Sequence, residues 1–373
     1  MKRLLLIVLT MTGAFAFGER PDLMTYTDEQ GNRREVVTEK DWETRRQEIL
    51  DAMQEVMGRL PDRDPLPPLE VQVRHVQEEE TFVRKTILFT AAENEYVPAY
   101  LYLPRREGKS VSDKRPAMLV LHETDDLGKR SVDGERSRPN RAYARELARR
   151  GYVVIAPDYP SFGELKDYDF KSARYASGTM AGIFYHTKCV DLLQSLDEVD
   201  PDRIGVIGHS LGGHNAMFLA AFEPRLKVIV ASCGWTQFAN YDIGPAGIQH
   251  YGGRLGPWAQ DRYMPLIREK FQLDENRIPF EFHEVVALFA PRVFFSNAPS
   301  RDSNFDVAGV QKGIELASKA YIFHRVEDRL QVRYPNDEHD FPPDVRLEAY
   351  RLMDRVLDFH PDCDDCLMNP DTQ

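Results

Sequence analysis

The chain has 373 residues, 42% of them hydrophobic, so it can bury a substantial core and is long enough for one α/β domain with extensions. Its 48 Lys and Arg are outnumbered by 60 Asp and Glu, which gives a formal net charge of -12. An acidic surface repels phosphate backbones, so the composition argues against a nucleic-acid partner.

The first residues predict a cleavable signal peptide. Lys2 and Arg3 form a positively charged start, residues 4–17 are apolar, and Ala14-Phe15-Ala16 supplies small residues for cleavage. The apolar stretch is shorter than the ~20 residues that a membrane-spanning helix needs. We therefore expect residues 1–16 to be removed, and the mature protein to be exported to the periplasm or the medium without a stable membrane anchor.

Residues 17–80 predict an N-terminal extension that carries one helix. Thr38 can cap this helix, and apolar residues from Trp42 onward recur at helical spacing until the proline-rich stretch 61–68. Two strand-like runs follow, at residues 81–91 and 96–103. They predict an antiparallel hairpin that opens the main domain.

From Ala117 onward, short apolar runs alternate with longer helical segments, which is typical of a parallel sheet covered by helices on both faces. The predicted strands are 117–121, 152–156, 203–207, 227–232, 292–297 and 330–334, and the predicted helices are 141–150, 181–196, 211–222, 307–318 and 344–357. The fold class is therefore α/β, a doubly wound and mostly parallel sheet. We assign the catalytic domain to residues 81–358 and a C-terminal tail to residues 359–373.

Residues 234–288 form a connection too long for an ordinary strand-to-helix crossover, so we interpret this segment as a cap insertion. It contains six large aromatic residues that can line a substrate pocket or form the insertion's own core, and the core is the simpler reading for any single ring. They are Trp235, Phe238, Tyr241, Tyr251, Trp258 and Tyr263.

The four cysteines are too few for a disulfide framework. Cys363 and Cys366 have the spacing of a redox pair or of half a zinc site. Neither a thioredoxin-like context nor a second ligand pair accompanies them, so we expect a small local disulfide. Cys189 and Cys233 lie in segments that should be buried, where a free thiol acts as a small hydrophobic group.

Gly208-His209-Ser210-Leu211-Gly212 stands directly between a predicted strand and an apolar helix. In this context G-x-S-x-G forms a nucleophile elbow, a tight strand-to-helix turn that exposes the serine above the sheet. The glycines let neighbouring backbone pass close by, and the helix N-terminus favours a developing oxyanion. Ser210 is therefore the candidate nucleophile.

A serine needs a base to take its proton, and after such an elbow the acid and then the histidine follow in chain order. Six histidines follow Ser210, and His339 lies in the loop after the last predicted strand, where the base belongs. The acid should follow a late strand, which leaves Asp302 and Asp306. We favour Asp302, because Asp306 stands where it can cap the next helix.

The oxyanion needs two backbone N-H donors. Leu211 supplies one, and either Glu123 or Thr124, after the strand 117–121, supplies the other. A metal site at His122 and Glu123 is disfavoured, because adjacent residues of an extended chain point to opposite faces. We expect no metal and no cofactor.

Four segments together resemble the dienelactone hydrolase-like and acetyl xylan esterase-like α/β hydrolases: residues 121–124, 151–159, 202–213 and 339–342. The resemblance implies the α/β-hydrolase fold with Ser210, Asp302 and His339 as a triad. It also implies ester hydrolysis through an acyl-enzyme, on small or carbohydrate-linked esters. The chain also differs from this family in two ways. The dienelactone hydrolases proper resemble enzymes with a cysteine nucleophile, where this chain has Ser210, and the insertion at 234–288 is larger than in their minimal fold.

The sequence thus predicts an exported serine carboxylic-ester hydrolase. One alternative is a prolyl-oligopeptidase-like peptidase, although residues 17–116 are too few for the large gating domain such enzymes usually carry. Another is a catalytically silent binding protein on the same fold. The acyl and alcohol specificity and the oligomeric state stay open.

Overall fold

The computed structural model describes residues 20–63, 66–105, 114–135, 138–171 and 173–367. The predicted signal peptide, residues 1–16, lies outside the described residues. Within the described part of the chain, no helix combines the length and apolar character that crossing a membrane would require.

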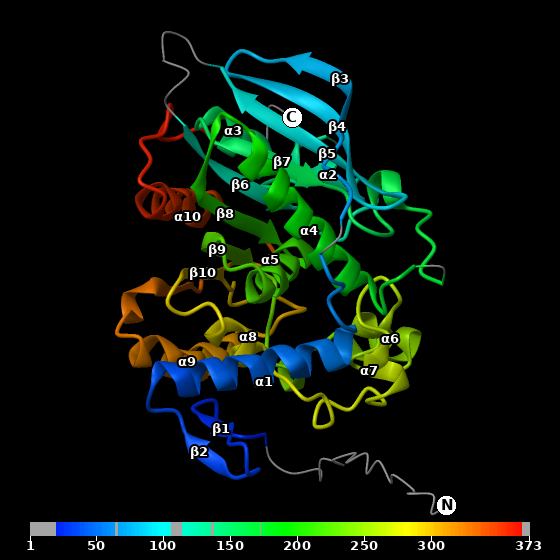
Figure 1. Cartoon of the computed structure of the whole chain (residues 1–373), viewed down its shortest axis with the longest axis vertical. Coiled ribbons are helices and arrows are strands. Elements are labelled where there is room, and N and C mark those ends of the chain that lie inside the picture. Colours follow the sequence, from blue (N-terminus) through cyan, green and yellow to red (C-terminus); the bar gives the residue numbers. More distant parts are fainter. Residues whose placement is uncertain (1–19, 64–65, 106–113, 136–137, 172, 368–373) are drawn as a thin grey trace, which may run out of the picture.

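A nine-stranded sheet organises the molecule, in the order β11-β10-β9-β8-β6-β7-β5-β4-β3 (Figure 1). The strands are β3 (Val71–Glu78), β4 (Phe82–Ala92), β5 (Glu95–Pro104), β6 (Arg115–Leu121), β7 (Val153–Pro157), β8 (Val199–His209), β9 (Leu226–Ser232), β10 (Val293–Asn297) and β11 (Leu330–Arg333). Strands β6 to β11 pair in parallel, whereas β3, β4 and β5 join the sheet antiparallel. The predicted doubly wound, mostly parallel sheet is confirmed.

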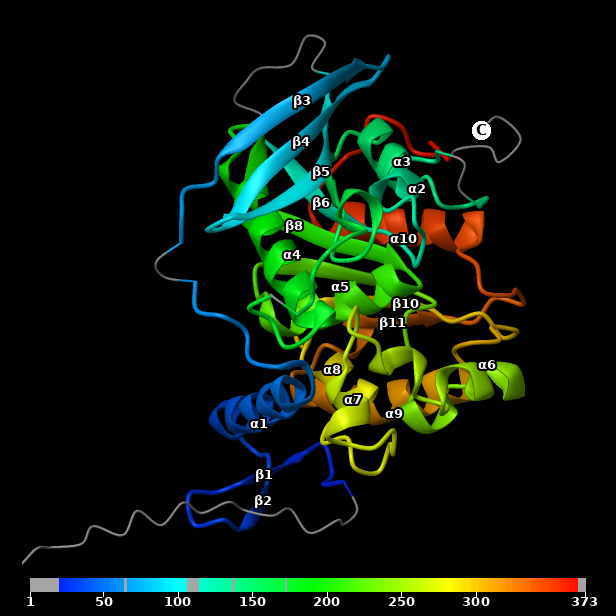
Figure 2. The same cartoon turned by 90° about the vertical axis from the view of Figure 1, so that its right-hand side faces the viewer.

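Helices cover both faces of this sheet (Figures 1 and 2). They are α2 (Lys129–Val132), α3 (Tyr143–Arg149), α4 (Gly178–Ser195), α5 (Leu211–Phe222), α9 (Val307–Phe323) and α10 (Pro343–Val356). Along β7, Val153 and Ile155 join the core under α4 and α5, whereas Val154 and Ala156 join the core under α3 and α10. Successive side chains of a strand face opposite layers, so a strand covered on both faces is apolar throughout.

The sheet begins at Val71, before the boundary at residue 81 that the sequence pattern indicated. Strand β3 is the outer edge strand, and most of its residues are exposed on both faces. Its sequence therefore alternates polar residues with Val71, Val73 and Val76 and lacks the apolar run by which the central strands were found.

The N-terminal extension consists of the hairpin β1 (Thr25–Thr27) and β2 (Arg33–Glu35), followed by helix α1 (Glu39–Met57). Thr38 caps α1 as predicted, in a capping box with Asp41. Arg45 of α1 forms a buried ion pair with Glu284, and both side chains are 5% exposed. The extension is thereby attached to the insertion (Figure 2).

Residues 234–288 fold into short helices beside α1 (Figure 1). These are η2 (Phe238–Asn240), α6 (Gly244–Tyr251), η3 (Pro257–Ala259), α7 (Leu266–Glu269) and α8 (Phe282–Ala287). Five of the six aromatic side chains are buried, Tyr251 being the exception. Phe238 packs on Phe282 with ring centroids 4.9 Å apart, so these rings contribute to the insertion's own core.

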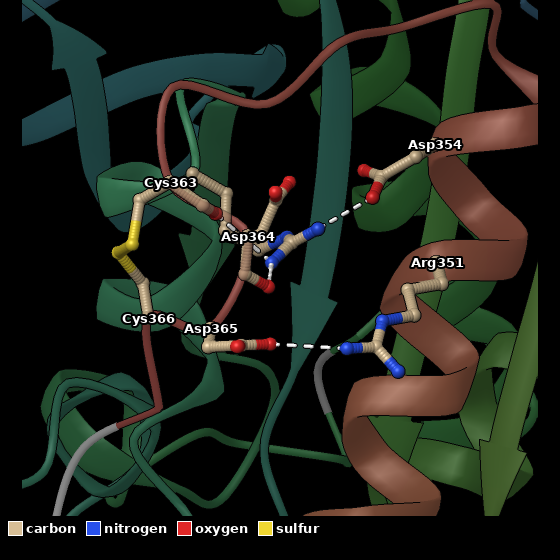
Figure 3. The surroundings of a disulfide bond; sticks show 7 residues. Arg351, Asp354, Cys363, Asp364, Asp365 and Cys366 are labelled. Carbon is tan, nitrogen blue, oxygen red and sulfur yellow. Dashed lines mark hydrogen bonds and ion pairs between the residues drawn. A yellow bond between two sulfur atoms is a disulfide. The ribbon is translucent and has the colours of Figure 1, made fainter.

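Cys363 and Cys366 form the predicted local disulfide (Figure 3). Cys189 and Cys233 are free and buried. Arg351 of α10 pairs with Asp365 between the two cysteines, at 3.1 Å. The described residues after α10 are thus tied to that helix.

Arg45→Met should lower the free energy of unfolding by ~3 kcal/mol, because it leaves the Glu284 carboxylate buried without its cation. Arg34→Met is the matched control, since Arg34 is 59% exposed in its pair with Asp28 and such pairs contribute under ~1 kcal/mol. Urea unfolding of both variants measures the difference. Equal losses for the two variants would contradict this account of the extension.

Candidate active site

Three candidate residues follow three parallel strands of the sheet. Ser210 comes directly after β8, Asp302 lies in the loop after β10, and His339 lies in the loop after β11. The carboxyl ends of parallel strands lie at one edge of a sheet, where open α/β sheets bind their ligands. The topology therefore brings these side chains together from positions 129 residues apart in the chain.

Ser210 adopts a strained backbone conformation, with φ 54° and ψ -121°. Its N-H donates to the carbonyl of Ser232 at 2.8 Å, which fixes the turn against β9. A Cβ on Gly212 would lie 2.0 Å from the Leu121 oxygen, and a Cβ on Gly208 would lie 2.2 Å from the carbonyl carbon of Gly212. Only glycine permits these approaches, and they hold the serine at the start of α5.

His339 connects the other two side chains. Its Nε2 lies 2.9 Å from Ser210 Oγ, and its Nδ1 lies 2.8 Å from Asp302 Oδ2. A carboxylate only accepts, so Nδ1 carries the proton and Nε2 accepts the serine hydroxyl hydrogen. The Asp302 side chain is fully shielded from solvent, and its Oδ1 accepts the N-H groups of Asn304 and Phe305.

Asp306, the alternative acid, caps helix α9 by accepting the N-H of Ala308 at 2.8 Å. The structure therefore brings Asp302 to the imidazole and leaves Asp306 in the capping role. Phe305, between the two acids, lies against the His339 ring with centroids 5.8 Å apart.

The segment after β6, which carries Glu123 and Thr124, lies against the nucleophile turn through the Leu121 contact with Gly212. The Tyr159 hydroxyl donates to the His122 carbonyl, and His122 Nδ1-H donates to the Glu123 carbonyl at 2.6 Å. In a trans peptide the N-H points away from the carbonyl. The N-H groups of Glu123 and Thr124 therefore face away from these partners, and both stay candidate oxyanion donors beside Leu211.

Several histidines near the site are buried and neutral. Burial lowers the pKa of His122 to about 4 and that of His214 to about 3. His214 lies on α5 four residues after Ser210, but its ring stacks on Phe218 and packs at an angle against Trp258, at 4.0 and 4.5 Å between centroids. It thus belongs to the buried aromatic core.

Among the described residues, one group has the spacing of metal ligands: Cys233, Asp302 and His339, whose ligand atoms lie within 4.8 Å of one another. Two of these side chains bond to each other. Burial, and then the charge of Asp302, raises the pKa of the Cys233 thiol well above its ordinary value. A protonated thiol is a poor metal ligand, so the chemistry of this donor set favours the hydrogen-bonded triad.

Sequence reasoning missed Arg141 and Asp340. Arg141 is buried and pairs with Asp340, the residue after His339. Arg141 and Asp340 are 199 residues apart in the chain, and a single charged residue in a loop is too common to indicate such a contact.

Residues 138–370 match the profile of the alpha/beta hydrolase family, which is more than half of the chain. The chain belongs to this family, as the resemblance in its sequence implied.

Three similar proteins illustrate the relationship. The Bacillus subtilis (strain 168) hydrolase YtaP is 28% identical over 313 residues, covering 81% of this chain and 96% of YtaP. The 4-O-methyl-glucuronoyl methylesterase of Hypocrea jecorina (strain QM6a) is 28% identical over 174 residues, 43% of this chain and 36% of that protein. A solved carbohydrate esterase family 15 glucuronoyl esterase from Caldicellulosiruptor kristjansonii superposes with a TM-score of 0.65 at 21% identity, covering 95% of each chain, and so shares the fold.

His214→Phe should make the free energy of unfolding less dependent on pH in the acidic range. A histidine whose folded pKa is about 3 stays neutral in the folded state, whereas the unfolded state takes up a proton below pH ~6.5. The contribution of this histidine to the free energy of unfolding is thus complete above pH ~6.5. It is lost as pH falls toward 3, by up to ~1.4 kcal/mol per pH unit for each such group. A phenylalanine ring would fill the same apolar site without this loss.

Urea unfolding at pH 7, 6 and 5 measures the slope, with His360→Phe as an exposed control. An unchanged slope in His214→Phe would show that this ring does not titrate as proposed.

Proposed function

We propose that this protein is a serine carboxylic-ester hydrolase with Ser210 as its nucleophile. The observation that carries the proposal is the continuous hydrogen-bonded series Ser210 Oγ, His339 and Asp302, at 2.9 and 2.8 Å. Membership of the alpha/beta hydrolase family supports it.

The geometry suits nucleophilic acyl transfer. Ser210 Oγ attacks the acyl carbonyl carbon while His339 Nε2 takes its proton, and Asp302 stabilises the imidazolium that forms. The N-H of Leu211 and that of Glu123 or Thr124 bind the oxyanion. The intermediate collapses, the alcohol leaves with the proton from His339, and water then releases the acid from the acyl-enzyme by the same steps.

We infer that the substrate is a small or carbohydrate-linked ester. The Hypocrea jecorina relative is named for a methylesterase activity on a 4-O-methyl-glucuronoyl group, and the solved neighbour is named as a glucuronoyl esterase. Phe305 lies beside the His339 imidazole, with ring centroids 5.8 Å apart.

We propose that the protein acts after export, since residues 1–16 have the pattern of a signal peptide. The mature chain would consist of an N-terminal extension, a catalytic domain that runs from strand β3 to residue 358 with a cap insertion at about 234–288, and a tail at 359–373. N-terminal sequencing of the protein secreted by its host would test the cleavage site.

Ser210→Ala should lower kcat/KM by ~10⁴-fold or more, since it removes the nucleophile. The assay is turnover of p-nitrophenyl acyl esters and acetylated or methyl-esterified sugar oligomers, beside peptide p-nitroanilides. Ser300→Ala, an exposed serine in the acid loop, is the control and should keep full activity. Serine-dependent cleavage of peptides alone would replace the esterase with a peptidase, and ester turnover that survives in Ser210→Ala would end the proposal.

Asp302→Asn and Asp306→Asn separate the two candidate acids. Asp302→Asn should lower kcat by ~10³–10⁴-fold, because an amide no longer stabilises the imidazolium or fixes its tautomer. Asp306→Asn should keep kcat, because asparagine also caps helices well. Kinetics on the preferred ester checks both, and a larger kcat loss in Asp306→Asn would reverse the assignment.

A further inference from the structure

Arg141 lies outside the proposed catalytic groups, yet its guanidinium joins the two loops that carry them. It stands just before α3, and its side chain is 3% exposed. Nη1 forms an ion pair with Asp340 Oδ1, and Nη2 donates to the His339 carbonyl at 3.4 Å. On its other side, Nε lies 3.6 Å from Oε1 of Glu123 in the oxyanion segment.

The loop that carries His339 has no regular structure, and Glu338, the residue before the imidazole, is exposed. Asp340 supplies the anchors. Its Oδ2 accepts Asn140 Nδ2 at 2.6 Å, and its carbonyl accepts Asn297 Nδ2 at 2.9 Å and the Cys233 thiol at 3.2 Å. Asp340 is therefore held by Asn140, Asn297 and Cys233, and Arg141 adds the charged contact.

The charges around Arg141 explain why arginine stands here. Glu123 is buried, and burial raises the pKa of its carboxyl while the Arg141 charge opposes this rise. A guanidinium presents several donors in a rigid planar fork, so Arg141 can hydrogen-bond to Asp340 and to the His339 carbonyl while its charge lies 3.6 Å from the Glu123 carboxyl. A lysine ammonium is a point charge and cannot span these three partners.

We propose that Arg141 is a positioning residue. It fixes the His339 imidazole through Asp340, and it ties the base loop to the oxyanion segment through Glu123. The inference rests on the proposed function, because it assigns Arg141 a role in the reaction of Ser210. Misplacing a catalytic group by about 1 Å can cost ~10²-fold in rate. Loss of Arg141 should therefore lower kcat while KM changes little.

The test compares Arg141→Ala and Asp340→Ala, the double variant, Arg141→Lys, and Arg150→Ala as the control. Arg150 follows α3 and is likewise buried in an ion pair, but with Asp354 on α10 and with the C-terminal tail. Both arginine-to-alanine variants break a buried pair, so both should lose thermal stability. Only loss of Arg141 should affect the chemistry.

Two readouts at a temperature where each variant is folded decide the matter: kcat and KM on the preferred ester, and the rate at which a fluorophosphonate labels Ser210. Arg141→Ala should lower kcat and the labelling rate by ~10²-fold with KM within ~3-fold. Arg150→Ala should keep both. The double variant should lose less than the product of the two single losses, because the two residues share the Arg141–Asp340 contact, and Arg141→Lys should not restore the rate.

The proposal fails if folded Arg141→Ala retains kcat and labelling within ~3-fold of the unchanged protein, or if Arg150→Ala loses as much. If Arg141→Ala does not fold, the same kcat and labelling measurements on Asp340→Ala test the proposal. The Asp340 side chain is 27% exposed, so it tolerates truncation better. The labelling rate also separates this inference from the esterase proposal. It reports on activation of Ser210 even where no ester is turned over.

Discussion

At the carboxyl end of β8 the chain turns so tightly that a Cβ on residue 212 would lie 2.0 Å from the carbonyl oxygen of Leu121. This contact joins the end of β6, which leads into the segment that carries Glu123 and Thr124, to the turn that presents Ser210. Glycine at 212 permits the approach, and the positive φ of Ser210 is its conformational cost. The neighbouring strands over-determine the turn, since Ser210 N-H also bonds to Ser232 at the end of β9.

Buried polar contacts extend this arrangement outward. Tyr143 donates to the Leu121 carbonyl at 2.6 Å, and Tyr159 donates to the next carbonyl along the chain. His122 completes the set with its own contact to Glu123, and its lowered pKa keeps it neutral in that position. Each hydrogen bond restricts the backbone conformation of this segment, so the direction of its N-H groups is fixed before a substrate binds. Preorganised donors of this kind need no rearrangement during the reaction.

The sequence was most informative where structure is local. The apolar runs of β6 to β10 and the glycines around Ser210 depend on neighbours in the chain, and they were found without the structure. Strand β3 was missed because an exposed edge strand needs no apolar pattern. Arg141 was missed because its importance arises from Asp340 and Glu123, which approach it only after the sheet has formed. The choice between Asp302 and Asp306 likewise depended on loop geometry that chain order does not specify.

The insertion at 234–288 reaches the candidate active site through a polar contact, Tyr263 hydroxyl to Thr124 Oγ1 at 3.2 Å. Thr124 is exposed and belongs to the oxyanion segment, whereas Tyr263 is buried beside Trp258. The insertion is also fixed from the far side by Arg45 of α1. A segment held at Tyr263 and at Glu284 can shape the approach to Ser210 without altering the contacts among Ser210, His339 and Asp302. Substrate selection and chemistry can then change independently, because the residues that would select belong to the insertion and those that would react belong to the segments that follow β8, β10 and β11.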